Sequence, residues 1–534
     1  MTHPIRHDTS PPPPIATKPD ERSPASPSDP QAFLALSAFN GADATTCISN
    51  DNPLDVNKDY FPADTRVAQD GAIAGTATVT FASAFSITYH KYFKVVKNIK
   101  DSKTYILRIC GSDAPTKYSD GTAIEADAKH FSVPVKGVAV GWSTPYAALE
   151  LLGLEDELKV VDPQYIHSPC LRQKEKAGDV TSQGSGSDGW APGPGYAGSA
   201  GTYNHTLDWL AATKDSADVA AVLTDGNSPP TGGCGCDKDI VFDPASDGSP
   251  LGRAEWLKFL AAFFNEEDRA NLVIDREKAA YDATKALATA AAATHGSTKK
   301  KCAWIKPNAN TATFGITLKA DAYKVAYCQD AGMTAVVPVD GSTSQDFTDA
   351  AAWKTFAADI DVFIDESGEY GGPTDYDTKA EVFALMGPGF GESDLKAGAL
   401  VLRLDRELSD NSATSTKFYE TNSGDSGHNY AWLESGVFRP AHALQGLVHE
   451  VWPDYVKAIP DTCVDYFRDV IAGETHVIKD HNHCVKWDNA NAESKCITNI
   501  LSDDEYAAIR MSPAAKPSFI VAILVALVVA FIGA

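Results

Sequence analysis

The sequence predicts an α/β protein with two Rossmann-like lobes, joined by a long rigid interlobe helix, with a ligand cleft between the lobes. Three observations carry this prediction. A strand–helix–strand unit covers residues 133–162, and the alternation of strands and helices resumes at residue 302. Between them, residues 254–294 hold two long helical patterns in succession. Since alternating strands and helices form parallel sheets, this break predicts the boundary between two separate α/β lobes.

The first lobe opens with a predicted β-hairpin over residues 85–110, whose polar stretch KDSK forms the turn. Residues 133–140 (VPVKGVAV) and 158–162 (LKVVD) are predicted strands on either side of a short helix. After a Gly/Ser/Pro-rich insertion at 176–202, which is flexible by composition, residues 217–225 (ADVAAVLTD) form another buried strand.

The short helix between the first two parallel strands has clear signals at both ends. Ser143 or Thr144 is its expected N-cap, and Pro145 occupies its first position. Gly153 follows its last residue, where a left-handed conformation is usual.

Two long helices are predicted in the middle of the chain, at 254–273 and 275–294, the second ending at Gly296. The first is amphipathic, with large apolar residues on one face at helical spacing: Trp256, Phe259, Leu260, Phe263 and Phe264. The second is expected to run uninterrupted between the lobes.

The second lobe repeats the alternation of strands and helices. Its predicted elements are strand 302–307, helix 320–333, helix 346–358, strand 361–366, strand 398–405 and helix 430–455. Gly332 ends the first of these helices, and Pro453 stops the last one.

Charge and cysteine content bound the function. The chain has 46 basic and 71 acidic residues, a formal charge of -25, which argues against nucleic acid as a partner. Its ten cysteines are even in number and contain no CxxC pair, so we expect disulfides rather than buried free thiols, and an oxidising compartment. We interpret Cys234 and Cys236 as disulfide partners in preference to interpreting them as a metal site. The glycosylation sequon at Asn204 adds weak support for secretion.

The N-terminal region predicts disorder followed by a leader. Residues 1–30 contain nine prolines, and 32–44 combine a short apolar stretch with the cleavage pattern Ala42-Asp43-Ala44, without a basic region before it. We interpret this as an incompletely represented secretory leader; the alternative is a disordered cytosolic tail.

The last sixteen residues, 519–534, are almost all apolar and fall short of the roughly 20 that span a bilayer. A short apolar tail of this kind resembles a GPI attachment signal, with Ser512, Pro513 and Ala514 as small residues before it. A single-pass anchor and a cytosolic tail anchor are the alternatives. We predict that the folded part lies at the outer face of the plasma membrane, held by its C-terminus.

The order of units in the second lobe is specific. It includes DAGM, AVVPV, FTDAAAWKTFAADIDVFIDES and WLESGVFRPAHALQGLVHEVWP, and it follows AEWLKFLAAFFNEEDRA and VPVKGVAVGWSTPYAALELLGLEDELKVVD. Over residues 85–456 this order resembles the class III substrate-binding proteins, which deliver cobalamin, siderophores or haem to bacterial transporters. The cysteines and lipid tail depart from that pattern and look like the surface-anchored relatives of eukaryotic microbes, including algal cobalamin acquisition proteins.

The predicted divisions of the chain follow from this resemblance and from composition. They are a disordered or leader region (1–44), an N-terminal extension (45–84), the first lobe (85–250), interlobe helices (251–298), the second lobe (299–456), a cysteine-bearing stalk (457–511) and a hydrophobic anchor or GPI signal (512–534).

In such a fold the ligand binds beyond the carboxyl ends of the strands. A corrin ring has apolar faces and a rim of amides, so it needs flat aromatic walls and neutral hydrogen-bonding groups. The residues predicted to bind it follow strands in the two lobes: Trp142, Ser143, Tyr165, His167, Asn308, Glu366 and Tyr370. Each of them has packing in a core or loop as its alternative.

The resemblance implies a surface protein that captures cobalamin for uptake. The protein would pass the cobalamin to an unidentified receptor or transporter. No resident cofactor is expected, and cobalamin enters as the transported ligand. Haem is the alternative, with Tyr165, His167 or Tyr370 as axial ligand. A ferric siderophore is another, although the sequence shows no Arg/Lys cluster at the strand ends, only Arg403 and Arg406 on or just beyond the late strand.

Other chemistries have weaker signals. Residues 476–484 (HVIKDHNHC) have spacing that suits zinc or copper, but we expect a disulfide-tied stalk there and predict no metal site. No GxSxG, HExxH, P-loop or GxGxxG motif follows a strand, so we do not expect an enzyme. A two-lobe α/β enzyme with a cysteine-bound cluster is the remote alternative.

Overall fold

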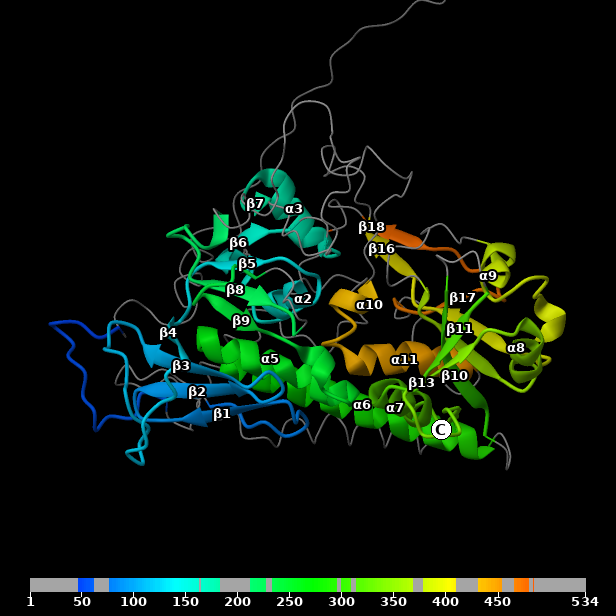
Figure 1. The fold of residues 1–534 in the computed structure, drawn as a ribbon, viewed down its shortest axis with the longest axis horizontal. Coiled ribbons are helices and arrows are strands. Elements are labelled where there is room, and N and C mark those ends of the chain that lie inside the picture. Colours follow the sequence, from blue (N-terminus) through cyan, green and yellow to red (C-terminus); the bar gives the residue numbers. More distant parts are fainter. Residues whose placement is uncertain are drawn as a thin grey trace, which may run out of the picture.

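The computed structural model of the chain describes residues 47–61, 76–162, 165–182, 212–226, 233–294, 299–308, 314–367, 378–409, 431–453, 465–479 and 484. These residues form two α/β lobes joined by a long helix, which confirms the predicted fold class (Figure 1). The leader, the glycosylation sequon at Asn204, Tyr370 and the apolar C-terminal tail lie outside the described residues.

The first lobe contains two sheets. The four-stranded sheet has the order β1-β2-β3-β4, with antiparallel pairs except for the parallel pair β3 and β4. The five-stranded sheet has the order β7-β6-β5-β8-β9 and is parallel throughout. The strands are β1 (Phe85–Tyr89), β2 (Phe93–Asn98), β3 (Lys103–Ile109), β4 (Lys129–Val133), β5 (Val138–Val140), β6 (Leu158–Val161), β7 (Thr181–Ser182), β8 (Ala221–Thr224) and β9 (Asp239–Val241).

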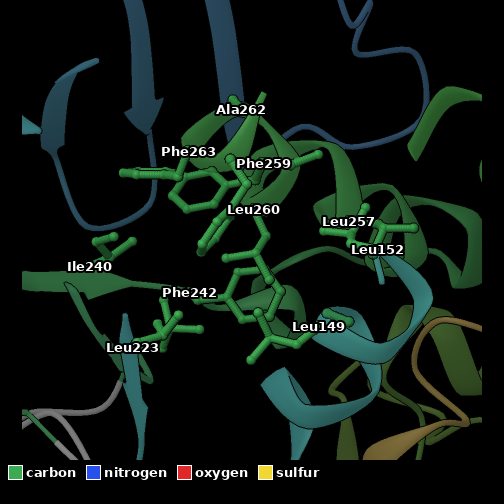
Figure 2. Packing of buried hydrophobic residues seen from close by; sticks show 14 of the residues in the cluster. Leu149, Leu152, Leu223, Ile240, Phe242, Leu257, Phe259, Leu260, Ala262 and Phe263 are labelled. Carbon is green, nitrogen blue, oxygen red and sulfur yellow. The ribbon is translucent and has the colours of Figure 1, made fainter. Parts of the chain in front are cut away.

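Helix α5 (Pro250–Phe264) fills the core of the first lobe. Its large apolar residues meet Ile240, Phe242 and Leu223 from the parallel sheet and Leu149 from the short helix α2 (Thr144–Leu151), as Figure 2 shows. The apolar face predicted for this helix is buried, but the helix is buried on nearly all sides and is not amphipathic. Its charged residues Glu255 and Lys258 are buried as an ion pair.

Helix α2 has the predicted ends. Ser143 occupies the N-cap position, although its side chain makes no capping bond, and a proline stands in the first turn. Gly153 has a φ of +67°, and a Cβ there would lie 2.5 Å from Arg269 Nη1. Arg269 in turn donates from Nε to the carbonyl oxygen of Leu151. The positive φ therefore favours a glycine where α2 meets the long helix.

Helix α6 (Glu267–Thr294) is the predicted interlobe helix. It runs for 28 residues, about 42 Å, without interruption. It packs against α5 in the first lobe and against α11 (Pro440–Val451) and α7 (Ala322–Asp330) in the second, so it crosses beneath both lobes (Figure 1). The break between α5 and α6 falls at Asn265, with a φ of +59°, eight residues before the predicted boundary at 273.

The second lobe surrounds a seven-stranded mixed sheet with the order β13-β11-β10-β14-β15-β17, in which β12 also pairs with β10. A small parallel pair, β16 with β18, lies beside it. The strands are β10 (Lys301–Pro307), β11 (Ile316–Lys319), β12 (Thr334–Ala335), β13 (Ser344–Phe347), β14 (Val362–Asp365), β15 (Leu400–Arg403), β16 (Glu407–Ser409), β17 (Arg468–Asp469) and β18 (Val477–Lys479).

The remaining helices are short. They are α3 (Pro169–Ala177) in the first lobe, and α8 (Ala350–Ala357), α9 (Lys379–Leu385) and α10 (Ala431–Glu434) in the second, with 3-10 turns at Glu155–Glu157, Pro244–Ser246 and Glu392–Asp394. None of the described helices is both long and apolar enough to cross a bilayer.

Two predicted elements are split. The strand predicted at 133–140 is β4 and β5 in different sheets, because Pro134 has no N–H to continue the ladder. The helix predicted at 430–455 is α10 and α11. Pro440 starts the second of these, and a Cβ at Gly436 would lie 2.6 Å from the carbonyl oxygen of Trp432.

The predicted stalk, 457–511, needs correction in its described part. Residues 465–479 supply β17 to the edge of the second sheet and β18 to the small pair, so they belong to the second lobe. The sequence gives little warning, because each of these strands is only two or three residues long.

Disulfides join the described cysteines, as predicted. They link Cys47 to Cys110, Cys170 to Cys484, Cys234 to Cys236 and Cys302 to Cys328. The second of these ties α3 of the first lobe to the chain that follows β18 of the second lobe.

Candidate functional site

The segments that follow β5 and β6 of the first lobe meet the second lobe at one buried junction. Thr144 lies just after β5 and donates from its hydroxyl to the carbonyl oxygen of Leu433 in α10, at 3.1 Å. Glu434, the next residue, accepts the backbone N–H groups of His167 (2.6 Å) and Ser168 (2.9 Å), which follow β6. Figure 1 shows α10 between the lobes at this level. Helix α10 therefore connects the second lobe to the expected ligand-binding edge of the first.

Two buried carboxyl groups, Glu150 and Glu434, lie at this junction, and we call them the junction acids. The hydroxyl of Ser168 donates to Glu150 at 2.6 Å. Burial raises the pKa of Glu434 to about 8, against the opposing effect of the two N–H donors. Burial, together with the charge of Glu434, also raises the pKa of Glu150 well above its usual range. Burial thus favours the neutral, protonated form of both junction acids.

His167 lies on the second-lobe side of this cluster. Its Nε2 lies 3.6 Å from Oε1 of Glu407 in β16, and both side chains are largely buried. Arg172 of α3, which is also buried, donates from Nε and Nη2 to the carbonyl oxygen of Ile166 and fixes the segment between β6 and α3. His167 is consequently an interlobe contact in this structure.

An aromatic contact closes the junction beside α5. Phe438, from the turn between α10 and α11, is fully buried in the core of the first lobe and stacks on Phe242, with ring centroids 6.0 Å apart. Trp142 packs on the same Phe242 at 6.4 Å. In the described part of the chain, the buried indole Nε1 of Trp142 has no hydrogen-bond partner. One predicted ligand residue thus holds an unused donor beside the junction.

The strand ends of the second lobe carry a charged network around Asp405, which we call the Asp405 network: Asp405, Arg403, Arg468 and His476. Arg468 donates from Nε and Nη2 to the two oxygens of Asp405, each at 2.8 Å. Burial would raise the pKa of Asp405, but the charges of Arg403 and Arg468 and the His476 bond outweigh it and hold that pKa far below its usual range.

No Arg/Lys cluster was predicted at the strand ends, but the structure contains one in the second lobe. Arg403 and Arg468 lie opposite each other on β15 and β17, and Arg406 follows β15 and pairs with Glu474. The cluster is invisible in the sequence because its members come from segments about sixty residues apart. Carboxylates compensate it: Asp365 lies 3.5 Å and Asp405 3.1 Å from Arg403 Nε.

The other predicted ligand residues are dispersed. Tyr165 is half-buried against the core of the first lobe. Glu366 is buried in the second lobe, where it accepts from Lys324 Nζ at 2.5 Å and from Trp304 Nε1 at 2.7 Å. Asn308 is exposed at the end of β10. Of the predicted set, Ser143, Tyr165 and His167 lie on the segments that reach the junction, with Trp142 beside it.

The junction acids were missed by the sequence reading. A signal for Glu150 was present, since it is the one charged residue in the apolar run YAALELLG. A charge in such a run is either exposed or paired inside the protein. Glu434 has no comparable signal in the sequence. The predicted helix 430–455 ran through the end of α10, where Glu434 lies, so the break that positions Glu434 was not predicted.

The surface of the described residues includes two hollows that contain no predicted ligand residue. One, of about 960 Å³, lies at the amino ends of β5 and β6 and includes Lys136 and Lys159; the other, of about 410 Å³, adjoins α8 and includes Phe356. Within the described chain, Cys234, Cys236 and Asp239 form the single group with donor atoms close enough for a metal ion. The first and last residues of the HVIKDHNHC segment have other partners than a metal ion: His476 bonds Asp405, and Cys484 is in a disulfide.

No protein-family model matches the chain, and no curated protein matches it in sequence. Solved structures do resemble it. A periplasmic binding protein from Veillonella parvula has a TM-score of 0.40 and 14% identity, over 63% of this chain and 97% of that one. A periplasmic haem-binding protein from Pseudomonas aeruginosa has a TM-score of 0.36 and 13% identity, over 60% and 93%. The periplasmic haem-binding protein HutB of Vibrio cholerae has a TM-score of 0.33 and 12% identity, over 51% and 90%.

Proposed function

We propose that this chain is a two-lobe substrate-binding protein whose ligand binds at the junction between the lobes. The observation that carries the proposal is that the segments after β5 and β6 of the first lobe meet α10 and the start of β16 of the second lobe at one place. There, Thr144 and His167 of the first lobe meet α10 and Glu407 of the second. The crevice at the carboxyl ends of strands is where open α/β sheets bind ligands.

Cobalamin is the ligand that we favour. Its rim of amide groups supplies many N–H donors, and the junction holds carboxyl acceptors in Glu150, Glu434 and Glu407. The half-buried ring of Trp142 offers an apolar face, and its unpaired indole N–H can donate to an amide carbonyl. Tyr165 lies half-buried on the segment that leads to the junction. Neutral, amide-rich chemistry suits this setting.

Haem and ferric siderophores are the second candidates. Their anionic groups would meet buried carboxyl groups, and the arginines of the second lobe are already compensated by Asp365 and Asp405. For haem, His167 is the axial candidate, yet its Nε2 lies 3.6 Å from Glu407 and would have to leave that contact. Tyr165 is the other axial candidate. We therefore favour cobalamin over haem.

An enzymatic role is the remote alternative. A cysteine-bound cluster needs free thiolates at the junction, whereas the eight described cysteines are in disulfides. The solved structures named above are binding proteins. We therefore propose capture without turnover, at the cell surface, by a chain held through its C-terminal tail and passing its ligand to a receptor or transporter.

Isothermal titration calorimetry tests the proposal. The full chain, in detergent micelles, is titrated in parallel with cobalamin, haem and a ferric siderophore. We expect saturable binding of one cobalamin per chain and no comparable signal from the other two. Tight haem binding without a cobalamin signal would transfer the proposal to haem, and the absence of binding to all three would contradict a ligand site at the junction.

A further inference from the structure

The disulfide between Cys234 and Cys236 differs from the other described disulfides. It lies in the loop between β8 and β9, and only Gly235 separates its two cysteines. The other three disulfides close sequence separations of 26, 63 and 314 residues. Because a cross-link stabilises a fold mainly by closing a long loop, this one adds the least to the stability of the chain. Its role therefore has to be sought elsewhere.

The loop is held by bonds that do not depend on the disulfide. The two carboxylate oxygens of Asp239 accept the backbone N–H of Cys234 at 2.8 Å and that of Cys236 at 3.2 Å. Lys129 Nζ, from β4, donates to the carbonyl oxygens of Cys236 (2.8 Å) and Asp239 (3.0 Å). Lys238 anchors the same loop to two further carbonyl oxygens. The two sulfur atoms should therefore stay close together after the S–S bond is reduced.

The loop is packed on one side and open on the other. A Cβ on Gly233 would lie 3.0 Å from Thr224 Cγ2 and 3.4 Å from a carboxylate oxygen of Asp239, so the inner side is filled. Gly235 has a φ of +62°, and a Cβ there would meet nothing within 4 Å. Cys236 is half-buried, whereas Cys234 is buried. An incoming ion thus has an approach at the tip of the loop.

The sulfur atoms of Cys234 and Cys236 and a carboxylate oxygen of Asp239 lie within 4.8 Å of one another. Two thiolates and a carboxylate are ligands that Zn²⁺ accepts in tetrahedral sites, where three protein ligands leave the fourth position for water or another ligand. We propose that this loop is a redox-gated Zn²⁺ site, with Cys234, Cys236 and Asp239 as ligands in the reduced state.

The chemistry balances with an external thiol as reductant. Two thiol molecules supply two electrons and two protons, the S–S bond breaks, and the products are two cysteine thiols and the disulfide of the reductant. Zn²⁺ then displaces the protons of the thiols as it binds. In the oxidised state the sulfur lone pairs belong to a disulfide, which does not bind Zn²⁺ in this way.

Cobalt substitution tests the site in the full chain. The protein is reduced with a phosphine, the phosphine is removed without oxygen, and alkylation with mass spectrometry identifies the reduced cysteines. We expect reduced wild-type protein to take up one Co²⁺ with a thiolate-to-cobalt absorption band that Zn²⁺ abolishes. The oxidised protein should show no such band. Asp239→Asn, which replaces the charged oxygen ligand by a neutral amide, should bind Co²⁺ more weakly than reduced wild type.

The control is the double variant Cys234→Ser and Cys236→Ser, which keeps every other cysteine of the chain. Equal Co²⁺ uptake by this variant and by reduced wild type would overturn the proposal, since the ion would then bind elsewhere. Circular dichroism is recorded alongside. Reduction of this disulfide only together with loss of the folded signal would overturn it as well, because the loop would not be preformed.

Discussion

Buried carboxyl groups at the strand ends have opposite proton equilibria in two neighbouring regions. The junction acids, Glu150 and Glu434, are held by a hydroxyl and by backbone N–H groups, and burial raises their pKa values. Asp405 is equally buried, but Arg468 binds both of its oxygens and its pKa is lowered. Burial alone therefore does not decide the ionisation of an acid; a full countercharge does.

The difference separates a region built for permanent charge from one that responds to its surroundings. The Asp405 network is a fixed part of the second lobe. The junction acids lie where the two lobes meet and where we propose that the ligand binds, so protons and ligand act on the same contacts.

Removal of the Asp405 charge should have the largest effect. Asp405→Asn leaves Arg403 and Arg468 buried without their shared countercharge, so we expect a loss of about 3–5 kcal/mol in the free energy of unfolding. A carboxyl group with a lowered pKa stabilises the fold above its unfolded pKa and loses this effect only in acid. The loss should therefore be nearly the same at about pH 6 and about pH 8, as measured by urea unfolding.

The matched control is Asp359→Asn, which removes an exposed partner of Lys301. Such a surface pair is worth about 0–1 kcal/mol. If Asp405→Asn cost no more than this control, the buried network would not be a stabilising feature of the second lobe.

The junction should instead show a pH dependence. Since the folded-state pKa of Glu434 is raised to about 8, the stability linked to its proton is full below the unfolded pKa and is lost as pH rises toward 8. Wild-type protein should therefore lose stability between about pH 5 and pH 8. Glu434→Gln, which stays neutral, should lose roughly 1–3 kcal/mol less over that range.

Glu392→Gln is the control for this experiment, because Glu392 is an exposed carboxylate paired with Lys379. Its pH profile should follow that of wild type. Parallel profiles for wild type and Glu434→Gln would show that the proton of Glu434 does not respond to folding.

A single neutral hydrogen bond across the junction should have the smallest effect. Thr144→Val keeps the shape of the side chain and removes the bond to Leu433, at a cost of about 0.5–1.5 kcal/mol in unfolding free energy. Thr355→Val is the comparison, since it removes an exposed bond within helix α8. Equal losses of unfolding free energy in the two variants would mean that the interlobe bond stabilises the fold no more than an exposed bond within a helix.

Much of the architecture could be predicted because its signals are local. Pro145 and Gly153 mark the ends of α2, and the apolar residues of α5 repeat at helical spacing. Strands β16, β17 and β18 could not be predicted, because two or three residues are too few for a periodic pattern. Their places depend on pairing with distant segments, as Arg468 with Arg403.

The site was harder to predict than the fold. Position after a strand selected Trp142 and His167, and the structure has them at or beside the junction. The same rule selected Glu366, which Lys324 and Trp304 bind inside the second lobe. The sequence predicts which residues follow a strand. It does not predict the partners of a carboxyl group, because these depend on tertiary packing.

The indole N–H of Trp142 gives the most direct test of a ligand at the junction. Trp142→Phe keeps an aromatic ring and removes the donor; Trp353→Phe does the same to another buried indole without a partner, in the core of the second lobe. Calorimetry with cobalamin should show about 2- to 13-fold weaker binding for Trp142→Phe, the value of one hydrogen bond, and wild-type affinity for Trp353→Phe. Unchanged affinity in Trp142→Phe, or equal losses in both variants, would contradict a ligand that binds beside Trp142.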